Sequence, residues 1–347
     1  MRKIVYYFFK WWIEAGIRYY YSKIEIHGLE NIPKDTPVLF LANHQNALMD
    51  ALLVGTFCKC KPYFLSRGDL FKNPLAKVLL NFLQMIPVYR IRDGKQSLGK
   101  NDAIFDFCAN LLMENHQVLI FPEGNHNIKK RIRPLSKGFT RILFKALDKQ
   151  PDLNLGLVPV GVNYIRAERF PDSAALYFDE NIPVLDLYDK KNIPESIKKM
   201  KAAVYERLKK QTTHIENEEN YEAILGKLDA MDVDYLTPSK VNVVLEALEK
   251  GSIKTKRNRL VPQLMKNLFT IMNFPFIIPW KLLLLPRIQQ KEFISTFRFL
   301  YALVLFPIYY LLVFWFLGNY IGNVLTAEFI LSHIVFNYLY IKLSSFT

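Results

Sequence analysis

The fold is decided by the stretch Val38-Leu39-Phe40-Leu41-Ala42-Asn43-His44-Gln45-Asn46-Ala47-Leu48-Met49-Asp50. The five apolar residues 38–42 predict a buried strand, and the mostly apolar run 51–57 predicts a helix. His44 and Asp50 therefore stand at the carboxyl end of a strand, which is where α/β sheets place their chemistry.

The residue types in this stretch suit a catalytic pair. Histidine has an unperturbed pKa that fits a general base near neutral pH. An aspartate about one and a half helical turns later can hold the imidazole in one tautomer and stabilise its cation. From these residues alone, the alternative is that His44 caps a helix and Asp50 faces solvent.

Composition indicates a membrane-associated protein. The chain has 347 residues, 51% hydrophobic, with 26 Phe, 19 Tyr and a formal net charge of +14. A basic, aromatic-rich chain suits an anionic membrane surface or phosphorylated substrates. Nucleic acid is not expected, because there is no zinc-ligand spacing and no RNA-binding signature. Three cysteines give no disulfide framework and are expected to be reduced, as on a cytosolic face.

Strands and helices alternate through about residue 185, which predicts an α/β domain with a mostly parallel central sheet flanked by helices. Polar residues follow four predicted strands, near positions 43, 90, 122 and 161. Parallel strands end on the same side, so these clusters are expected to converge on one site.

Three of these polar groups suit binding of an anion. Arg90 and Arg92 close one strand, and the planar fork of arginine suits phosphate, although a solvated strand end is an alternative. Gly124, after Glu123, lets the backbone approach a ligand closely. A run of basic residues then follows that can frame an anionic headgroup: Lys129, Lys130, Arg131 and Arg133.

Five regions are predicted along the chain. They are an interfacial membrane helix (1–21), the α/β domain (22–210), a helical polar and basic linker (211–260), a re-entrant or interfacial apolar segment (261–292) and two transmembrane helices (293–347). For residues 1–21, the alternative is a helix packed on the protein's own core. The transmembrane helices are expected near 299–317 and 321–341. Glu328 and His333 in the second are interpreted as a helix-packing or interface feature, and the alternative is a functional pair inside the membrane. The turn at 318–322 lacks basic residues, so the positive-inside rule places the catalytic domain on the cytoplasmic face.

Four blocks of this sequence resemble the glycerolipid acyltransferase family, which includes glycerol-3-phosphate and 1-acylglycerol-3-phosphate acyltransferases. In order, they are Asn43-His44 with Asp50, Ile86-Pro87-Val88-Tyr89-Arg90, Phe121-Pro122-Glu123-Gly124 and Val158-Pro159-Val160-Gly161. The resemblance covers roughly residues 20–185.

The resemblance implies a role for each block. His44 and Asp50 would be the catalytic pair, and Arg90 would bind the acceptor's phosphate. Glu123 and Gly124 would contribute to acceptor binding, and residues 158–161 would shape the acyl or acceptor pocket. Further expected substrate-binding residues are Asn43, Lys129 and Lys130.

This chain departs from the family pattern at two of the blocks. Five residues separate His44 from Asp50, where four are usual. The third block continues Asn125-His126-Asn127, where Thr-Arg-Ser is common, so Lys129, Lys130 or Arg131 would replace that arginine.

The implied activity is transfer of a fatty acyl group from an acyl thioester to a hydroxyl of glycerol 3-phosphate or lysophosphatidate in phospholipid synthesis. The donor would be acyl-CoA or acyl carrier protein, the partners would be membrane lipids, and no metal or other cofactor is expected. Oligomeric state is left open. The alternatives are an acyltransferase for another lysolipid or an amino-lipid, a metal-dependent hydrolase using His44, Asp50, Glu123 and His126, and a non-catalytic membrane lipid-binding protein.

Overall fold

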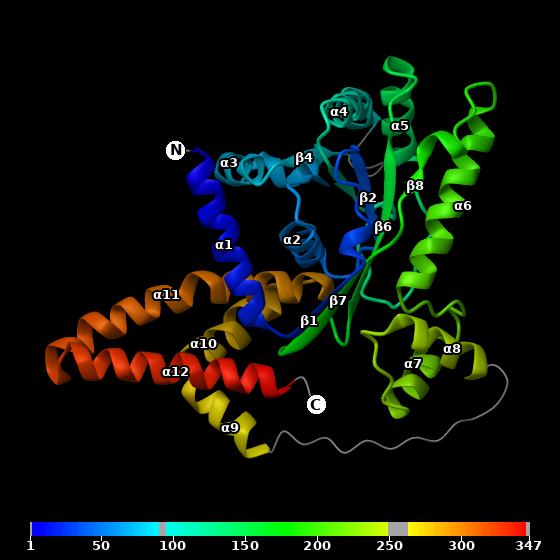
Figure 1. The fold of residues 1–347 in the computed structure, drawn as a ribbon. Helices are drawn as coiled ribbons and strands as arrows, with labels where there is room; N and C mark the ends of the chain where they lie inside the picture. Colours follow the sequence, from blue (N-terminus) through cyan, green and yellow to red (C-terminus); the bar gives the residue numbers. More distant parts are fainter. Residues whose placement is uncertain (1, 90–94, 249–262, 345–347) are drawn as a thin grey trace.

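The computed structural model describes residues 2–89, 95–248 and 263–344, and its centre is one eight-stranded sheet (Figure 1). The strands are β1 (Tyr21–His27), β2 (Val38–Ala42), β3 (Tyr63–Arg67), β4 (Met85–Val88), β5 (Val118–Ile120), β6 (Gly156–Tyr164), β7 (Asp172–Phe178) and β8 (Ile182–Pro183). The helices of the α/β domain are α1 (Arg2–Tyr20), α2 (Ala47–Phe57), α3 (Pro74–Phe82), α4 (Lys95–Met113), α5 (Gly138–Lys149) and α6 (Ile193–Gln211).

The sheet is mostly parallel, which confirms the predicted fold class. Its strand order is β1-β7-β6-β2-β5-β3-β4, and β8 pairs with β6. β2 is parallel to both β5 and β6, and β3 is parallel to β4 and β5. β7 and β8 run antiparallel to β6. Residues 172–183 thus contain two strands, the longer β7 and the short β8.

Helices cover both faces of the sheet (Figure 1). One apolar cluster joins β-strand residues to α4, α5 and α6, and includes Leu112, Phe139 and Val204. The other joins the opposite face to α1 and α2, and includes Ile17 and Leu53. The helices on the two faces hold the sheet in place. They therefore also position the edge at which the carboxyl ends of its parallel strands lie.

The carboxyl ends of five strands meet at that edge, as the polar clusters predicted. Leu41 of β2 lies opposite Ile120 of β5, and Ala42 lies opposite Val160 of β6. β6 continues past the end of β2 to Tyr164, because β7 supplies its hydrogen-bonding partner there. The block 158–161 is consequently buried inside the sheet. Its role in shaping an acyl or acceptor pocket stays a prediction.

Residues 215–248 form a small packed unit of their own. It contains α7 (Tyr221–Ala230) and α8 (Pro238–Leu248), which share an apolar cluster with Ile215, Leu228 and Tyr235. Up to residue 248, the predicted linker is thus a folded unit below α6 (Figure 1). The basic residues at 249–262 lie outside the described part of the chain.

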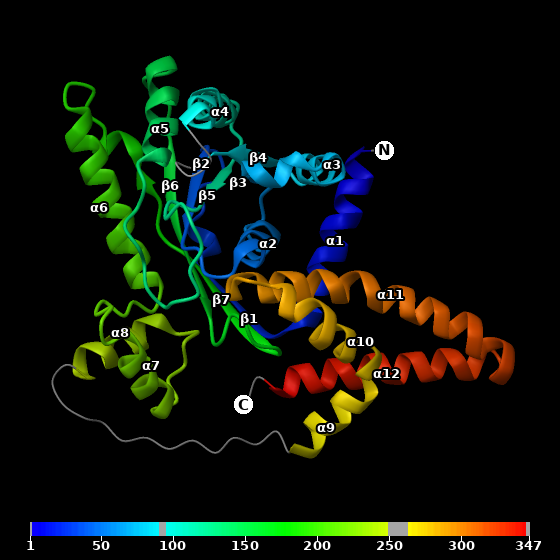
Figure 2. The ribbon, with the colours of Figure 1, turned by 180° about the vertical axis from the view of Figure 1, so that it is seen from behind.

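The C-terminal region contains two helices long and apolar enough to cross a membrane, α11 (Ile294–Ile321) and α12 (Asn323–Leu343). They form a hairpin that extends away from the sheet (Figure 1). The turn is shorter than the predicted 318–322, because α11 continues to Ile321. The chain reverses at Gly322, whose φ is 86°. Before the hairpin, α9 (Gln263–Met272) and the helical segment Phe274–Arg287, which opens with α10 (Phe274–Pro279), bend by 82° and pack beside it (Figure 2).

Polar side chains join the membrane helices to one another. The imidazole of His333 on α12 forms a hydrogen bond with the Tyr310 hydroxyl on α11 at 2.9 Å. Asn337 and Asn273 exchange amide hydrogen bonds of 2.7 and 3.0 Å, which ties α12 to the bend before α10. His333 thus sits in a helix-packing contact, whereas Glu328 is exposed.

Helix α1 has features of both alternatives for the N-terminal segment, a helix packed on the protein and a helix at a membrane interface. Ile17 and Tyr20, near its end, are buried against the α/β domain. Phe8 and Trp11, nearer its start, are 55% and 60% exposed. One part of the helix therefore packs on the protein, and its aromatic surface is left free for a bilayer interface.

Candidate active site

His44 and Asp50 form a direct hydrogen bond. The distance from His44 Nδ1 to Asp50 Oδ2 is 2.8 Å, and Asp50 is fully buried in the first turn of α2. The backbone N–H of Asn46 donates to the same carboxylate oxygen at 2.8 Å. The five intervening residues thus preserve the pair, and the chain turns at Ala47 with a positive φ of 42°.

The loop around His44 is held from the next strand of the sheet. The His44 ring stacks on Phe121, just after β5, with ring centroids 3.9 Å apart and an interplanar angle of 13°. Its backbone N–H donates to Glu123 Oε1 at 3.2 Å, and its carbonyl accepts from the Asn127 N–H at 2.9 Å. These contacts leave Nε2 on the side of the ring away from Asp50, where a general base needs its free nitrogen.

Glu123 supports this loop and does not face solvent. Its side chain is only 3% exposed, and its second oxygen accepts from Arg133 Nε at 2.7 Å. Burial raises the pKa of Glu123, and the Arg133 charge opposes that rise. Both carboxylate oxygens accept a hydrogen bond from within the protein, and one of these bonds positions the His44 backbone. A contact of Glu123 with the acceptor stays a prediction. Gly124 beside it is exposed, with φ 73°.

Three other predicted binding residues make side-chain contacts with other parts of the protein. The Asn43 side chain is buried and exchanges two hydrogen bonds with the Val162 backbone, at 2.9 and 2.7 Å, which fastens β2 to β6. Lys129 Nζ lies 4.9 Å from the ring centre of Tyr221 on α7. Lys130 Nζ lies 4.0 Å from the Tyr235 ring centre. Arg90, the expected phosphate ligand, lies outside the described residues.

The segment that enters the membrane hairpin borders the site. His126 Nε2 lies 3.0 Å from Gln290 Oε1, and the His126 ring meets Phe293 edge-on at 4.7 Å. His126 also meets the His44 ring edge-on at 5.6 Å. Burial lowers the pKa of His126, which favours its neutral form beside His44.

A second contact joins the hairpin to the loop that contains His44 through a single carbonyl group. The Ala167 carbonyl accepts from Asn46 Nδ2 at 3.1 Å and from Ser295 Oγ, in the first turn of α11, at 2.5 Å. The His44 loop and the hairpin are therefore hydrogen-bonded to the same oxygen atom. Sequence reasoning missed both contacts, because residues 288–295 are far along the chain and carry no motif.

Two further residues at the strand ends were also missed. The Tyr164 hydroxyl donates to Asp50 Oδ1 at 2.6 Å from the last position of β6. Arg67 ends β3 opposite Val88, two residues before Arg90, and its guanidinium makes a two-point contact with Asp69 at 3.0 and 2.5 Å. The available signal was the rule already used for Arg90, a polar residue at the end of a predicted strand. Within the described ranges, no group of three or more His, Cys, Asp or Glu side chains is placed to hold a metal ion.

Comparison with known proteins identifies the domain. Residues 23–163 match the Acyltransferase family model. The chain is 30% identical over 145 residues to the 1-acyl-sn-glycerol-3-phosphate acyltransferase BAT2 of Brassica napus, covering 42% of this chain and 40% of that protein. It is 33% identical over 86 residues to glycerol-3-phosphate O-acyltransferase 1 of Saccharomyces cerevisiae, covering 24% of this chain and 11% of that protein. Residues 23–163 are therefore similar to the acyltransferase domains of glycerolipid acyltransferases.

The match lies within the α/β domain and spans less than half the length of those relatives. Among solved structures, the 1-acyl-sn-glycerophosphate acyltransferase PlsC of Thermotoga maritima is 20% identical, with a TM-score of 0.41. That alignment covers 60% of this chain and 82% of PlsC.

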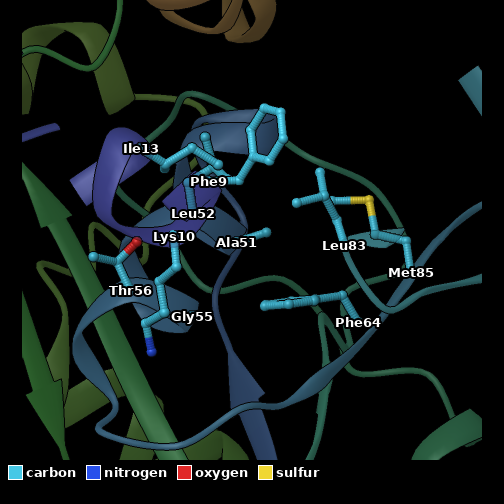
Figure 3. A pocket seen from close by; sticks show the side chains of 10 residues that line it. All are labelled: Phe9, Lys10, Ile13, Ala51, Leu52, Gly55, Thr56, Phe64, Leu83 and Met85. Atoms are coloured by element: carbon cyan, nitrogen blue, oxygen red, sulfur yellow. The ribbon is translucent and has the colours of Figure 1, made fainter. Parts of the chain in front are cut away.

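The acyltransferase domain also has an open, mostly apolar pocket between α1, α2 and the β3–β4 edge (Figure 3). The space among its lining atoms is about 520 Å³, which includes a part that is open to solvent. Ala51 and Gly55 of α2 line one side, Phe64 and Met85 line another, and Lys10 of α1 contributes the one charged group. Ala51 follows Asp50 directly, so the pocket begins on the helix that carries the Asp50 carboxylate.

Proposed function

We propose that this chain transfers a fatty acyl group from an acyl thioester to a hydroxyl of glycerol 3-phosphate or lysophosphatidate, as a step of phospholipid synthesis. The observation that carries the proposal is the buried 2.8 Å contact between His44 and Asp50 at the edge where the strands end. The family match over residues 23–163 supports it.

His44 is the general base in this reaction. Nδ1–H is donated to Asp50, so the imidazole keeps Nε2 unprotonated and able to take the proton of the acceptor hydroxyl. The acceptor oxygen then attacks the thioester carbonyl carbon, and Asp50 stabilises the imidazolium that forms. Collapse of the tetrahedral intermediate breaks the C–S bond, and the imidazolium returns its proton to the leaving thiolate.

The oxyanion of the tetrahedral intermediate needs hydrogen-bond donors. We assign this role to backbone N–H groups at the start of α2, where the helix dipole also favours negative charge. The pocket in Figure 3 has the apolar lining that an acyl chain requires, and it adjoins the same helix.

The acceptor's phosphate is assigned to cations at the same edge of the sheet. Arg67 ends β3 beside the strand that leads to Arg90, and its side chain is about one-third exposed. Arg133 carries a guanidinium next to Glu123 and is 24% exposed. Both arginines can bind a phosphate oxygen while keeping a carboxylate partner.

The α11–α12 hairpin anchors the domain in a membrane, and we place the domain on the cytoplasmic face. The support is the positive-inside rule applied to Arg287, Lys291, Arg298 and Lys342, which lie at the domain end of the hairpin. A site at the bilayer surface lets the acyl chain stay in apolar surroundings while the headgroup meets the arginines.

The test is an acyl-transfer assay on the purified full-length protein in phospholipid vesicles. Acyl-CoA and acyl carrier protein thioesters are each offered with glycerol 3-phosphate, lysophosphatidate, other lysolipids and an amino-lipid. The wild-type protein is expected to acylate a phosphate-bearing acceptor, and His44→Ala is expected to lose the activity without leaving the vesicles. His27→Ala is the matched control, because His27 lies exposed on the edge strand β1. Substantial activity of His44→Ala would remove His44 from the mechanism.

A further inference from the structure

Tyr164 contacts the catalytic carboxylate from the side opposite His44. It is the last residue of β6, is 1% exposed, and donates its hydroxyl proton to Asp50 Oδ1 at 2.6 Å. The other oxygen of Asp50 receives the N–H groups of His44 and Asn46. The three donors therefore approach the carboxylate from both ends.

A buried carboxylate needs donors on both oxygens to remain ionised and in one rotamer. Among the hydrogen bonds of the described residues, the Tyr164 hydroxyl is the one that reaches Oδ1 of Asp50. Burial and the neighbouring carboxylate raise the pKa of Tyr164, so its hydroxyl keeps its proton and stays a donor. Without that donor, nothing within the described structure holds Oδ1 and directs Oδ2 at His44.

Tyr164 is itself held in place from a second direction. Its backbone carbonyl accepts from Lys130 Nζ at 2.5 Å, and that ammonium lies 4.0 Å from the Tyr235 ring centre in the α7–α8 unit. Burial lowers the pKa of Lys130 to about 8. The aromatic ring of Tyr164 lies beside the buried ring of Tyr21, with centroids 6.2 Å apart. A lysine that the sequence suggested for the acceptor thus secures the tyrosine behind the catalytic pair.

We propose that Tyr164 is a positioning residue for acyl transfer, which acts by fixing the rotamer and charge of Asp50 so that Asp50 can orient His44. The proposal rests on the proposed function. It assigns no contact between Tyr164 and substrate, so substrate binding is expected to be unaffected when the hydroxyl is removed.

The first test is Tyr164→Phe, which removes the hydroxyl and keeps the ring. We expect kcat to fall about 10- to 100-fold with KM for both substrates within about twofold. The acid limb of the pH–kcat/KM profile should move to higher pH, because a carboxylate with fewer donors is more basic and raises the pKa of the imidazole beside it. Tyr177→Phe is the matched control, because Tyr177 lies on the neighbouring strand β7 and does not contact Asp50. Its hydroxyl donates to the Leu236 carbonyl at 2.7 Å.

A double-variant comparison separates positioning from loss of stability. In an Asp50→Asn background, Tyr164→Phe is expected to cost no further activity, because the group on which it acts is already changed. Wild-type kcat and an unmoved acid limb in Tyr164→Phe would overturn the proposal. So would an equal fold loss in the Asp50→Asn background.

A readout without turnover keeps this proposal separate from the proposed function. The pH dependence of His44 modification by diethyl pyrocarbonate, resolved by mass spectrometry, reports the pKa of His44 directly. Its midpoint should rise in Tyr164→Phe and stay unchanged in Tyr177→Phe, and an unchanged midpoint in both would overturn the proposal. A wild-type protein without acyl-transfer activity would overturn the proposed function, while this curve still decides the role of Tyr164.

Discussion

Replacing Asp50 by Asn tests the central contact of the site with almost no change in shape. In the structure, Asp50 Oδ2 lies 2.8 Å from His44 Nδ1. With an effective dielectric constant of about 20, two unit charges at that distance attract by about 6 kcal/mol. This is the upper limit of what the carboxylate contributes when His44 becomes an imidazolium.

The amide of an asparagine retains part of that interaction, so a loss of about 3–5 kcal/mol is expected in the transition state. That corresponds to a decrease of about 10²- to 10⁴-fold in kcat. The ground state contains a neutral imidazole and loses little, so KM should stay within about twofold.

The assay is continuous detection of the thiol released from acyl-CoA by protein in vesicles, at saturating acceptor. Asp102→Asn serves as the control, because Asp102 is exposed and pairs with Arg141 and Lys145 on the distant α5. Thermal denaturation of each variant verifies that the fold is retained. A kcat for Asp50→Asn within about threefold of the wild-type value would refute the catalytic pair.

Three further substitutions test how the site is built. Arg133→Met should lower the free energy of unfolding by about 3 kcal/mol, because it leaves the Glu123 carboxylate buried without its cation. Burial lowers the pKa of His214 to about 4, and its Nδ1 accepts from the Ile132 N–H at 3.0 Å. His214 therefore binds a proton more readily in the unfolded chain than in the folded protein. The free energy of unfolding should fall as the pH drops from about 6.5 to about 4, by about 3 kcal/mol at most. The variant His214→Asn keeps an acceptor and should show a flatter pH dependence. Ala47→Val should cost about 2–3 kcal/mol, because a β-branched residue is strained at a φ of 42°.

Each of these three has its own control and contrary result. Arg141→Met breaks an exposed ion pair with Asp102 and should cost less than about 1 kcal/mol, so equal losses in Arg133→Met and Arg141→Met would contradict the buried-carboxylate argument. The free energy of unfolding of wild type and His214→Asn is measured by denaturant titration at several pH values. An equal pH dependence in both would show that His214 is not the responsible group. Ala47→Gly should stay within about 1 kcal/mol of wild type, and a valine tolerated equally well would mean that the turn at position 47 is not strained.

The framework of the site could be predicted because local patterns determine it. The apolar runs at Val38–Ala42 and Val118–Ile120 form buried parallel strands, and the polar residues that follow them meet at one edge. The apolar hairpin was equally clear, since α11 and α12 are long and nearly free of charge. In each case the apolar residues that show the pattern are also the residues whose burial or membrane insertion forms the element.

The roles of individual polar side chains could not be predicted, because distant segments decide them. Glu123 looked free to bind an acceptor, but its carboxylate is occupied by the His44 backbone and by Arg133, ten residues later. Lys130 looked like part of a basic cluster, but the α7–α8 unit folds over it and Tyr235 covers its ammonium. Tyr164 reaches Asp50 across 114 positions of sequence, and no periodicity records such a pairing.

The carbonyl shared by Asn46 and Ser295 has a mechanical consequence. A transmembrane helix adjusts its tilt to the thickness of the surrounding bilayer. Here the first turn of α11 is hydrogen-bonded to the Ala167 carbonyl, which also holds Asn46, whose backbone N–H contacts Asp50. Because Ser295 and Asn46 bind the same carbonyl oxygen, a change in the tilt of α11 would be transmitted to the His44 loop. We therefore expect the reaction rate in vesicles to depend on the acyl-chain length of the host lipids, even for a water-soluble acceptor that never enters the bilayer.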